Sequence, residues 1–280
     1  MPLFLTTLSA LVLELTLTRL FSVVLFYHYA FLVISMALLG LASGAIIARI
    51  IPRGLSSERY RRLMGMTSLL CWLALFPALH LILTTNIWLV NSWGFIGRLS
   101  LLYVACLLPF ALAGFVIASI MTVGAGRIAR LYSWDLLGAS LGCVLFVPLI
   151  GQFGGPSTVL LVGALWCVSA AIWFRGTSSP RWMAASLIAG LVTLILVGFN
   201  GDGRLFDMRY MRGQPMKNEV FAKWNSFSRI SVHRDEKDLH WIEIDGGAGT
   251  WIPNSDLSGD VIEQKRASFG KVGPEVAMWL

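Results

Sequence analysis

The sequence predicts an α-helical multi-pass membrane bundle of about seven transmembrane helices, followed by a small soluble segment that contains a β-hairpin. Hydrophobic residues make up 56% of the chain and charged residues only 13%, with a mean hydropathy of +0.73. Soluble domains carry about 25% charged residues, so this composition is typical of a membrane protein. The net charge of +7 is concentrated in the links between apolar runs, which favours a role in membrane orientation and argues against nucleic-acid binding.

The apolar runs divide the chain into two expected domains, a transmembrane domain over residues 1–199 and a soluble segment over residues 200–280. Each run is long enough to cross the hydrocarbon core of a bilayer, which takes about 20 helical residues. In the fifth run, Pro148 and Gly151 shorten the clean apolar stretch. The runs cover residues 3–26, 30–50, 63–86, 99–123, 134–151, 157–174 and 182–199.

The first run contains two ionisable residues, Glu14 and Arg19. Charged groups in a bilayer are costly unless they face the protein interior, so neighbouring helices are expected to surround them. The two residues are five positions apart, about 140° around a helix, and are not expected to pair with each other. Glu14 is either a proton- or cation-binding group that lines a polar cavity or a packing residue satisfied within the bundle; Thr18 shares its face.

Glycines at helical spacing predict close contacts between helices. Gly40 and Gly44 form one GxxxG step, and Gly138 and Gly142 form a second; such steps let two helix backbones approach closely. Asp135 lies at the expected start of the run over residues 134–151. A carboxylate there suits the positive end of the helix dipole, and a substrate site is the alternative.

Arginine is concentrated in the links that follow the second, fourth and sixth runs. Cytoplasmic loops of membrane proteins carry an excess of Lys and Arg, so these links are expected in the cytoplasm. The same rule places the N-terminus on the cytoplasmic side of the plasma membrane. The arginines concerned are Arg49, Arg53, Arg59, Arg61, Arg62, Arg127, Arg130, Arg175 and Arg181.

The soluble segment shows a β-hairpin pattern. Ile230 and Val232 alternate with polar residues, as do residues 241–244, and the charged stretch DEKD lies between them. The sequence IDGGAGT that follows predicts a glycine-rich turn; the alternative, a phosphate cradle, lacks both GxGxxG and GxxxxGK[ST] spacing. The histidines and cysteines have no metal-ligand spacing, so neither a metal site nor a catalytic residue is expected.

Five stretches in order, ELTLTRLF, YHYAFLVISMALLGLASG, LYSWDLLGASLG, KWNSFSRISV and IDGGAGT, resemble bacterial membrane-bound spermidine-synthase-like proteins of the inner membrane. The resemblance implies a helical membrane region, then strands similar to the N-terminal strands of aminopropyltransferases, then a Rossmann-type domain. Asp245 and Gly246 match the LDG turn of that family. The glutamine usual after this turn in true synthases is absent here, which departs from the polyamine-binding pattern.

Length is the second departure from that family. The resemblance implies a glycine-rich cofactor loop beyond Gly270, whereas the chain given ends at Leu280. We therefore expect no cofactor in this chain, because decarboxylated S-adenosylmethionine belongs to the missing domain of such a fragment. The expected function is to anchor that domain in the membrane, inactive alone; whether the chain is an enzyme stays open.

The alternative function is a transporter-like bundle for a small solute or a polyamine. The expected partners are the lipid bilayer, a separate or downstream-encoded catalytic domain and a second copy of the chain. Nucleic acid is not expected among them.

Overall fold

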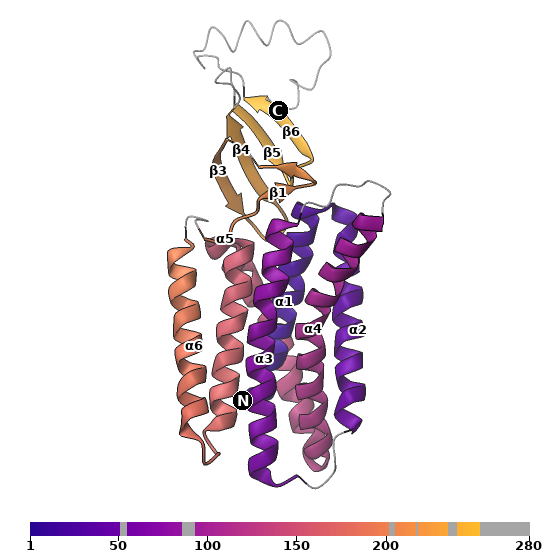
Figure 1. Ribbon diagram of the computed structural model, residues 1–280, viewed down its shortest axis with the longest axis vertical. Coiled ribbons are helices and arrows are strands. Elements are labelled where there is room, and N and C mark those ends of the chain that lie inside the picture. The colour runs from indigo at the N-terminus through magenta and orange to yellow at the C-terminus, as the bar shows by residue number, and fades with distance from the viewer. Residues whose placement is uncertain (51–54, 86–92, 202–204, 217, 235–239, 253–280) are drawn as a thin grey trace, which may run out of the picture.

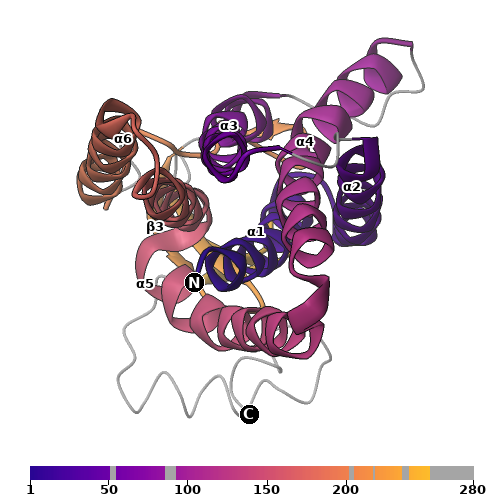
Figure 2. The ribbon, with the colours of Figure 1, turned by 90° about the horizontal axis from the view of Figure 1, so that it is seen from below.

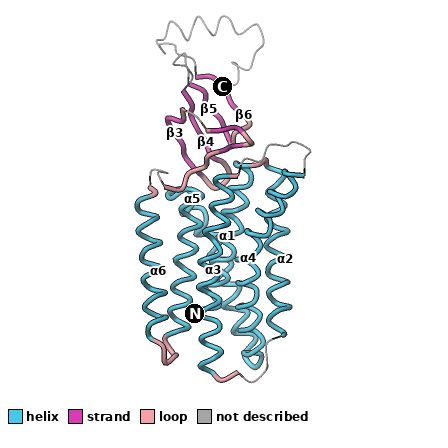
Figure 3. Tube along the Cα trace, viewed as in Figure 1, coloured by secondary structure: helices cyan, strands magenta, loops and turns pink. Residues whose placement is uncertain are grey.

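The computed structural model describes residues 1–50, 55–85, 93–201, 205–216, 218–234 and 240–252. Helices form an elongated bundle, and the strands gather at one end of it (Figure 1). Figure 3 shows the same division by secondary structure, with the strands confined to that end.

Six helices within the described ranges are long and apolar enough to cross a membrane. This number corrects the expected seven, because the runs over 134–151 and 157–174 form one element, α5, in which two helical stretches meet at a kink. Short 3₁₀ turns, Tyr27–Tyr29 and Ala125–Arg127, precede α2 and α5. The helices are α1 (Pro2–Val24), α2 (Ala30–Ile50), α3 (Ser57–Thr84), α4 (Trp93–Val123), α5 (Ile128–Phe174) and α6 (Pro180–Phe199).

The α5 element turns back on itself at Gly154, whose backbone has φ 76° and ψ 170°. A residue with a Cβ rarely adopts this conformation, so glycine suits the bend. Before the bend, Gly138 lies against Phe4 near the start of α1, and Gly155 at the bend lies against Leu20 near its end. After the bend, α5 runs the other way, and Gly176 just beyond it contacts Arg61 at the start of α3.

The core of the bundle is built around α1, which packs mainly on α5 and also touches α2 and α4. Seen along the bundle in Figure 2, α1 lies between α5 and α4. Its side chains Leu13, Leu17 and Phe21 are at most 1% exposed. The largest buried partner, Trp166, comes from the second half of α5.

The GxxxG glycines lie at two helix contacts. A Cβ at Gly40 would approach Phe110 of α4, and one at Gly44 would overlap the backbone of Ala111 in the same helix. Gly138 and Gly142 face α1 in the same way, against Thr7 and Leu8 among others. The small residues therefore sit where α2 meets α4 and where α5 meets α1, as close helix approach requires.

The strands form an antiparallel sheet of four strands in the order β3-β4-β5-β6, beside a two-stranded ribbon of β1 and β2. The expected hairpin is present, with Ile230 opposite Ile244 and Val232 opposite Ile242. The DEKD stretch lies outside the described residues. The strands are β1 (Tyr210–Met211), β2 (Gln214–Pro215), β3 (Glu219–Trp224), β4 (Arg229–Arg234), β5 (His240–Ile244) and β6 (Ala248–Ile252).

Backbone hydrogen bonds attach this region to the bundle. Arg209 N donates to Leu83 O at 3.0 Å and Arg212 N donates to Val24 O at 2.8 Å. Both acceptors are carbonyls in the last turn of a helix, which has no intrahelical donors for them. The ends of α1 and α3 thus supply acceptors for the ribbon that leads into the sheet.

Candidate functional site

Arg19, one of the two ionisable residues expected inside the bundle, pairs with the β5–β6 turn. Its Nη2 lies 3.0 Å from Asp245 Oδ2, and both side chains are less than one-fifth exposed. The expectation that neighbouring helices satisfy Arg19 is therefore wrong: the partner comes from the sheet. Arg19 lies within two turns of the end of α1, where the turn can reach it.

The turn itself is shaped by Asp245 and Gly246, which have φ 50° and φ 64°. A Cβ at Gly246 would lie 2.6 Å from Met211 Cγ, so glycine allows the turn to pack on the ribbon. Asp245 Oδ1 accepts from Arg229 N at 2.7 Å. Both carboxylate oxygens of Asp245 are therefore engaged in protein contacts, and the glycine turn faces protein side chains, not an open phosphate cradle.

The remaining acidic candidates, Glu14 and Asp135, line one cavity of about 310 Å³ between α1, α2, α4 and α5. Its other walls are mostly apolar and include Leu11, Leu41 and Phe110. Within the described ranges, neither carboxylate makes a hydrogen bond or an ion pair. The sequence offered no sign that these two residues line one cavity, because this depends on the packing of α5 against α1.

The structure changes the local environment expected for both residues. Helix α5 begins at Ile128 and has no acidic residue in its first turn, so the expected first-turn role of Asp135 is wrong. The Thr18 hydroxyl donates to the backbone carbonyl of Glu14 at 2.7 Å, not to its carboxylate. The Thr7 hydroxyl similarly contacts the backbone carbonyl of Asp135 at 3.3 Å.

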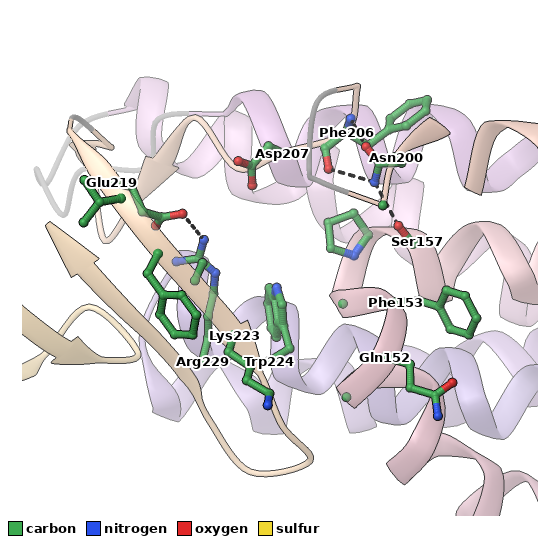
Figure 4. Close-up of a pocket in the computed structure, with 17 residues that line it drawn as sticks. Gln152, Phe153, Ser157, Asn200, Phe206, Asp207, Glu219, Lys223, Trp224 and Arg229 are labelled. Carbon is green, nitrogen blue, oxygen red and sulfur yellow. Dashed lines mark hydrogen bonds and ion pairs between the residues drawn. The ribbon is translucent and has the colours of Figure 1, made fainter. Parts of the chain in front are cut away.

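A larger cleft of about 600 Å³ lies between the bend of α5 and strands β3 and β4. Figure 4 shows its lining, with α5 on one side and β3 on the other. A Cβ at Gly154 would lie 3.0 Å from Trp224 Cδ1, so the end of β3 packs closely on the bend. The polar and charged lining residues are Gln152, Ser157, Asn200, Asp207, Glu219, Lys223 and Arg229.

Asn200 holds the chain where α6 ends beside the cleft. Its Nδ2 donates to Ser157 Oγ at 2.8 Å, and its Oδ1 accepts from Leu205 N and Phe206 N at 3.1 and 2.7 Å. The side chain is 4% exposed. Asn200 therefore joins α6, α5 and the following segment, and its hydrogen-bonding groups are already used.

Arg229 is the most buried charge in this cleft, at 2% exposed. Its Nη2 donates to Glu219 Oε1 at 2.8 Å, and its guanidinium lies over the Trp224 ring, 5.7 Å from the centroid. In the described part of the chain, Arg229 Nε, Arg229 Nη1 and Glu219 Oε2 are buried without a hydrogen-bond partner. Leaving a buried polar group unpaired costs about 1–3 kcal/mol, so these atoms favour an additional polar partner.

Sequence reasoning did not identify the residues of this cleft. Glu219, Lys223 and Arg229 come from two adjacent strands, and they meet α5 only through the docking of the sheet. One feature of the sequence could have indicated a polar site here. Arg229 is a charged residue next to Ile230, at the start of a strand with alternating apolar residues.

Metal binding finds no support among the residues that the structure describes. No group of three or more His, Cys, Asp or Glu side chains lies close enough there to hold an ion. Cys71, Cys106 and Cys167 are buried and Cys143 is exposed, all as free thiols.

No family model, curated protein or solved structure matches this chain in the comparisons made.

Proposed function

We propose that this chain is the membrane-anchoring portion of a spermidine-synthase-like protein of the bacterial inner membrane. In this proposal the helices hold the β-sheet at one end of the bundle, where it supports an aminopropyltransferase-type domain that lies outside these residues. The observation that carries the proposal is the ion pair between Arg19 of α1 and Asp245 of the sheet.

The attachment of the sheet supports an anchoring role. Beside the ion pair, Val24 and Leu83 accept backbone hydrogen bonds from Arg212 and Arg209. Contacts of α1 with the sheet, and of α1 and α3 with the ribbon that leads into it, restrict how the sheet moves relative to the bundle. A sheet held in this way is suited to position a further domain.

The engagement of Asp245 supports an inactive chain. By its resemblance to the aminopropyltransferases, Asp245 corresponds to the turn that lies near the polyamine site of true synthases. Here its two oxygens bind Arg19 and the backbone N–H of Arg229. Both oxygens of this carboxylate therefore hold the sheet in place, which favours a structural role for Asp245 over recognition of a substrate amine.

The proposed orientation places the N-terminus and the arginine-rich links in the cytoplasm. The end of α2, the start of α3 and the links from α4 to α5 and from α5 to α6 lie at the end of the bundle away from the strands (Figure 1). By the positive-inside rule, the end that carries Arg49, Arg61 and Arg175 faces the cytoplasm. The sheet then lies on the outer face of the membrane.

Replacement of Arg19 tests the anchoring proposal. In Arg19→Gln the ion pair is lost, so amide hydrogens of β5 and of the following turn are expected to exchange about threefold to fivefold faster, as for a partly exposed pair. Arg209→Gln is the matched control, because the Arg209 side chain is exposed and makes no ion pair with the described residues. Equal protection in wild type and Arg19→Gln contradicts the proposal.

A second candidate function, a transporter-like bundle for a small solute, is favoured by one observation. Glu14 and Asp135 share a cavity within the bundle, and neither has a cationic partner among the described residues. Ionisable residues at such positions commonly mark ion or proton pathways. A flux measurement on Glu14→Gln, described below, separates this function from anchoring.

A further inference from the structure

We propose that the cleft between the bend of α5 and strand β3 binds the headgroup of a phospholipid that carries a phosphate and a primary amine. The phosphate is placed near Arg229 and Lys223, and the ammonium near Asp207. This lipid site is independent of the anchoring function, because it does not involve the Arg19–Asp245 pair.

The anion-binding side of the cleft is built by Arg229 and Lys223. Although Arg229 is 2% exposed, its Nε and Nη1 have no partner within the described residues. Glu219 pairs with Nη2 only. Lys223 lies on the neighbouring strand β3 and also lines the cleft, and its side chain is exposed. Arg and Lys together favour a phosphate, to which they donate charge-assisted hydrogen bonds.

The cation-binding side is built by Asp207 and Glu219. Asp207 is exposed, and its Oδ1 accepts from Met208 N at 2.8 Å. Glu219 Oε2 has no partner among the described residues. Figure 4 places Asp207 and Glu219 toward one end of the cleft and Lys223 toward the other. Two acidic and two basic side chains match a ligand with both signs of charge better than a simple anion.

The position of the cleft selects a lipid over a water-soluble ligand. The cleft lies at the end of the helices, the level at which lipid headgroups meet a membrane bundle. Phe153, Val220 and Phe221 line it and are 41%, 54% and 53% exposed. Exposed apolar side chains beside a polar cleft suit acyl chains next to a headgroup. Its volume of about 600 Å³ lies in the range of small-molecule sites.

Native mass spectrometry of the whole chain in detergent tests this site. The protein is mixed with equal amounts of phosphatidylethanolamine, which carries a primary amine, and phosphatidylglycerol, which does not. We expect wild-type protein to retain phosphatidylethanolamine with a preference of about threefold to fivefold, the effect of a partly exposed charged contact. Lys223→Gln is expected to reduce total lipid retention, and Asp207→Asn to remove the preference. Arg209→Gln, outside the cleft, is the control and should behave as wild type.

A further measurement distinguishes a lipid headgroup from a free, water-soluble compound with the same phosphate and amine. Free phosphoethanolamine at millimolar concentration is not expected to displace the lipid, and efficient displacement would overturn the assignment to a lipid. Equal retention of the two lipids by the wild-type protein would overturn the proposal, as would wild-type behaviour of either folded variant. Asp207 and Lys223 are both exposed, so each substitution is expected to leave the fold intact. Thermal unfolding verifies this, and either variant alone is decisive.

Discussion

The indole of Trp224 lies against the backbone of Gly154, so closely that a Cβ at this glycine would be 3.0 Å from Trp224 Cδ1. The contact joins the last residue of β3 to the only non-helical residue described inside α5. The bend of the bundle and the docking of the sheet are therefore parts of one arrangement.

Gly154→Ala is expected to destabilise the protein. The new side chain would occupy a backbone conformation that costs about 1–3 kcal/mol for residues other than glycine. It would also displace Trp224. Thermal unfolding in detergent measures the effect as a lower Tm. The matched control is Gly151→Ala, in the helical part of α5, where a Cβ meets no atom within 4 Å; it should leave Tm unchanged or raise it slightly. A Tm for Gly154→Ala equal to that of the control contradicts this account of the bend.

Labelling of a single cysteine tests the proposed orientation. Ser57 is exposed at the start of α3, at the arginine-rich end, and Gln214 is exposed in β2 at the opposite end. In a Cys143→Ser background, Ser57→Cys is expected to resist an impermeant thiol reagent in intact cells, whereas Gln214→Cys is expected to react. Ready labelling of Ser57→Cys from outside would reverse the orientation.

Calorimetry with decarboxylated S-adenosylmethionine tests the expectation that this chain is inactive alone. The stretch over residues 200–280 contains no GxGxG loop between a strand and a helix, which is the element that binds such cofactors in Rossmann-type domains. We expect no saturable heat of binding and no aminopropyl transfer by the purified protein. Saturable binding in the micromolar range would show that a cofactor site exists within these residues.

Glu14→Gln separates the two candidate functions. Arg19 pairs with Asp245, so no described cation loses its partner when Glu14 becomes neutral. We therefore expect a folded protein whose free energy of unfolding changes by about 0.5 kcal/mol or less. In liposomes, a protein that only anchors a domain should show no pH-driven or polyamine-driven flux, whether residue 14 is Glu or Gln. Flux in the wild type that disappears in a well-folded Glu14→Gln protein would favour the transporter.

Asp135→Asn provides the companion measurement. If the two carboxylates of the cavity bind a cation together, both are required. The flux of the Asp135→Asn protein should then fall as that of the Glu14→Gln protein does. A loss of several degrees in Tm for either variant would instead indicate a structural partner.

The sequence was most informative where structure depends on local pattern. Long apolar runs identified the membrane-crossing helices, because helix length in a bilayer follows directly from the number of apolar residues. Alternation around Ile230 and Val232 identified the hairpin, because side chains in a strand point to opposite sides in turn. The more deeply buried face of β4 is nevertheless the one that carries Arg229 and Ser231. Neither feature required knowledge of distant residues.

The parts that were missed depend on contacts between distant segments. The pairing of Arg19 with Asp245 depends on the packing of the β5–β6 turn against α1, which local sequence patterns do not indicate. Glu14 and Asp135 line the same cavity because Gly138 lets α5 approach α1 closely. The break expected between residues 151 and 157, where glycines and Pro156 indicate a link, is present as the bend at Gly154. That the two stretches on either side of it form a single element was not expected.

The bend at Gly154 has a consequence for the compartments on either side of the membrane. An unbent helix of 47 residues would be about 70 Å long at 1.5 Å per residue, more than twice the thickness of a hydrocarbon core. By doubling back, α5 enters and leaves the bilayer at the same surface. If each of the six helices crossed once, the chain would return to the surface where it began. Because α5 crosses twice, the number of crossings is odd, and β6 lies at the opposite surface. In the proposed orientation, a domain joined after β6 begins among extracytoplasmic solutes and must take its substrates from that pool.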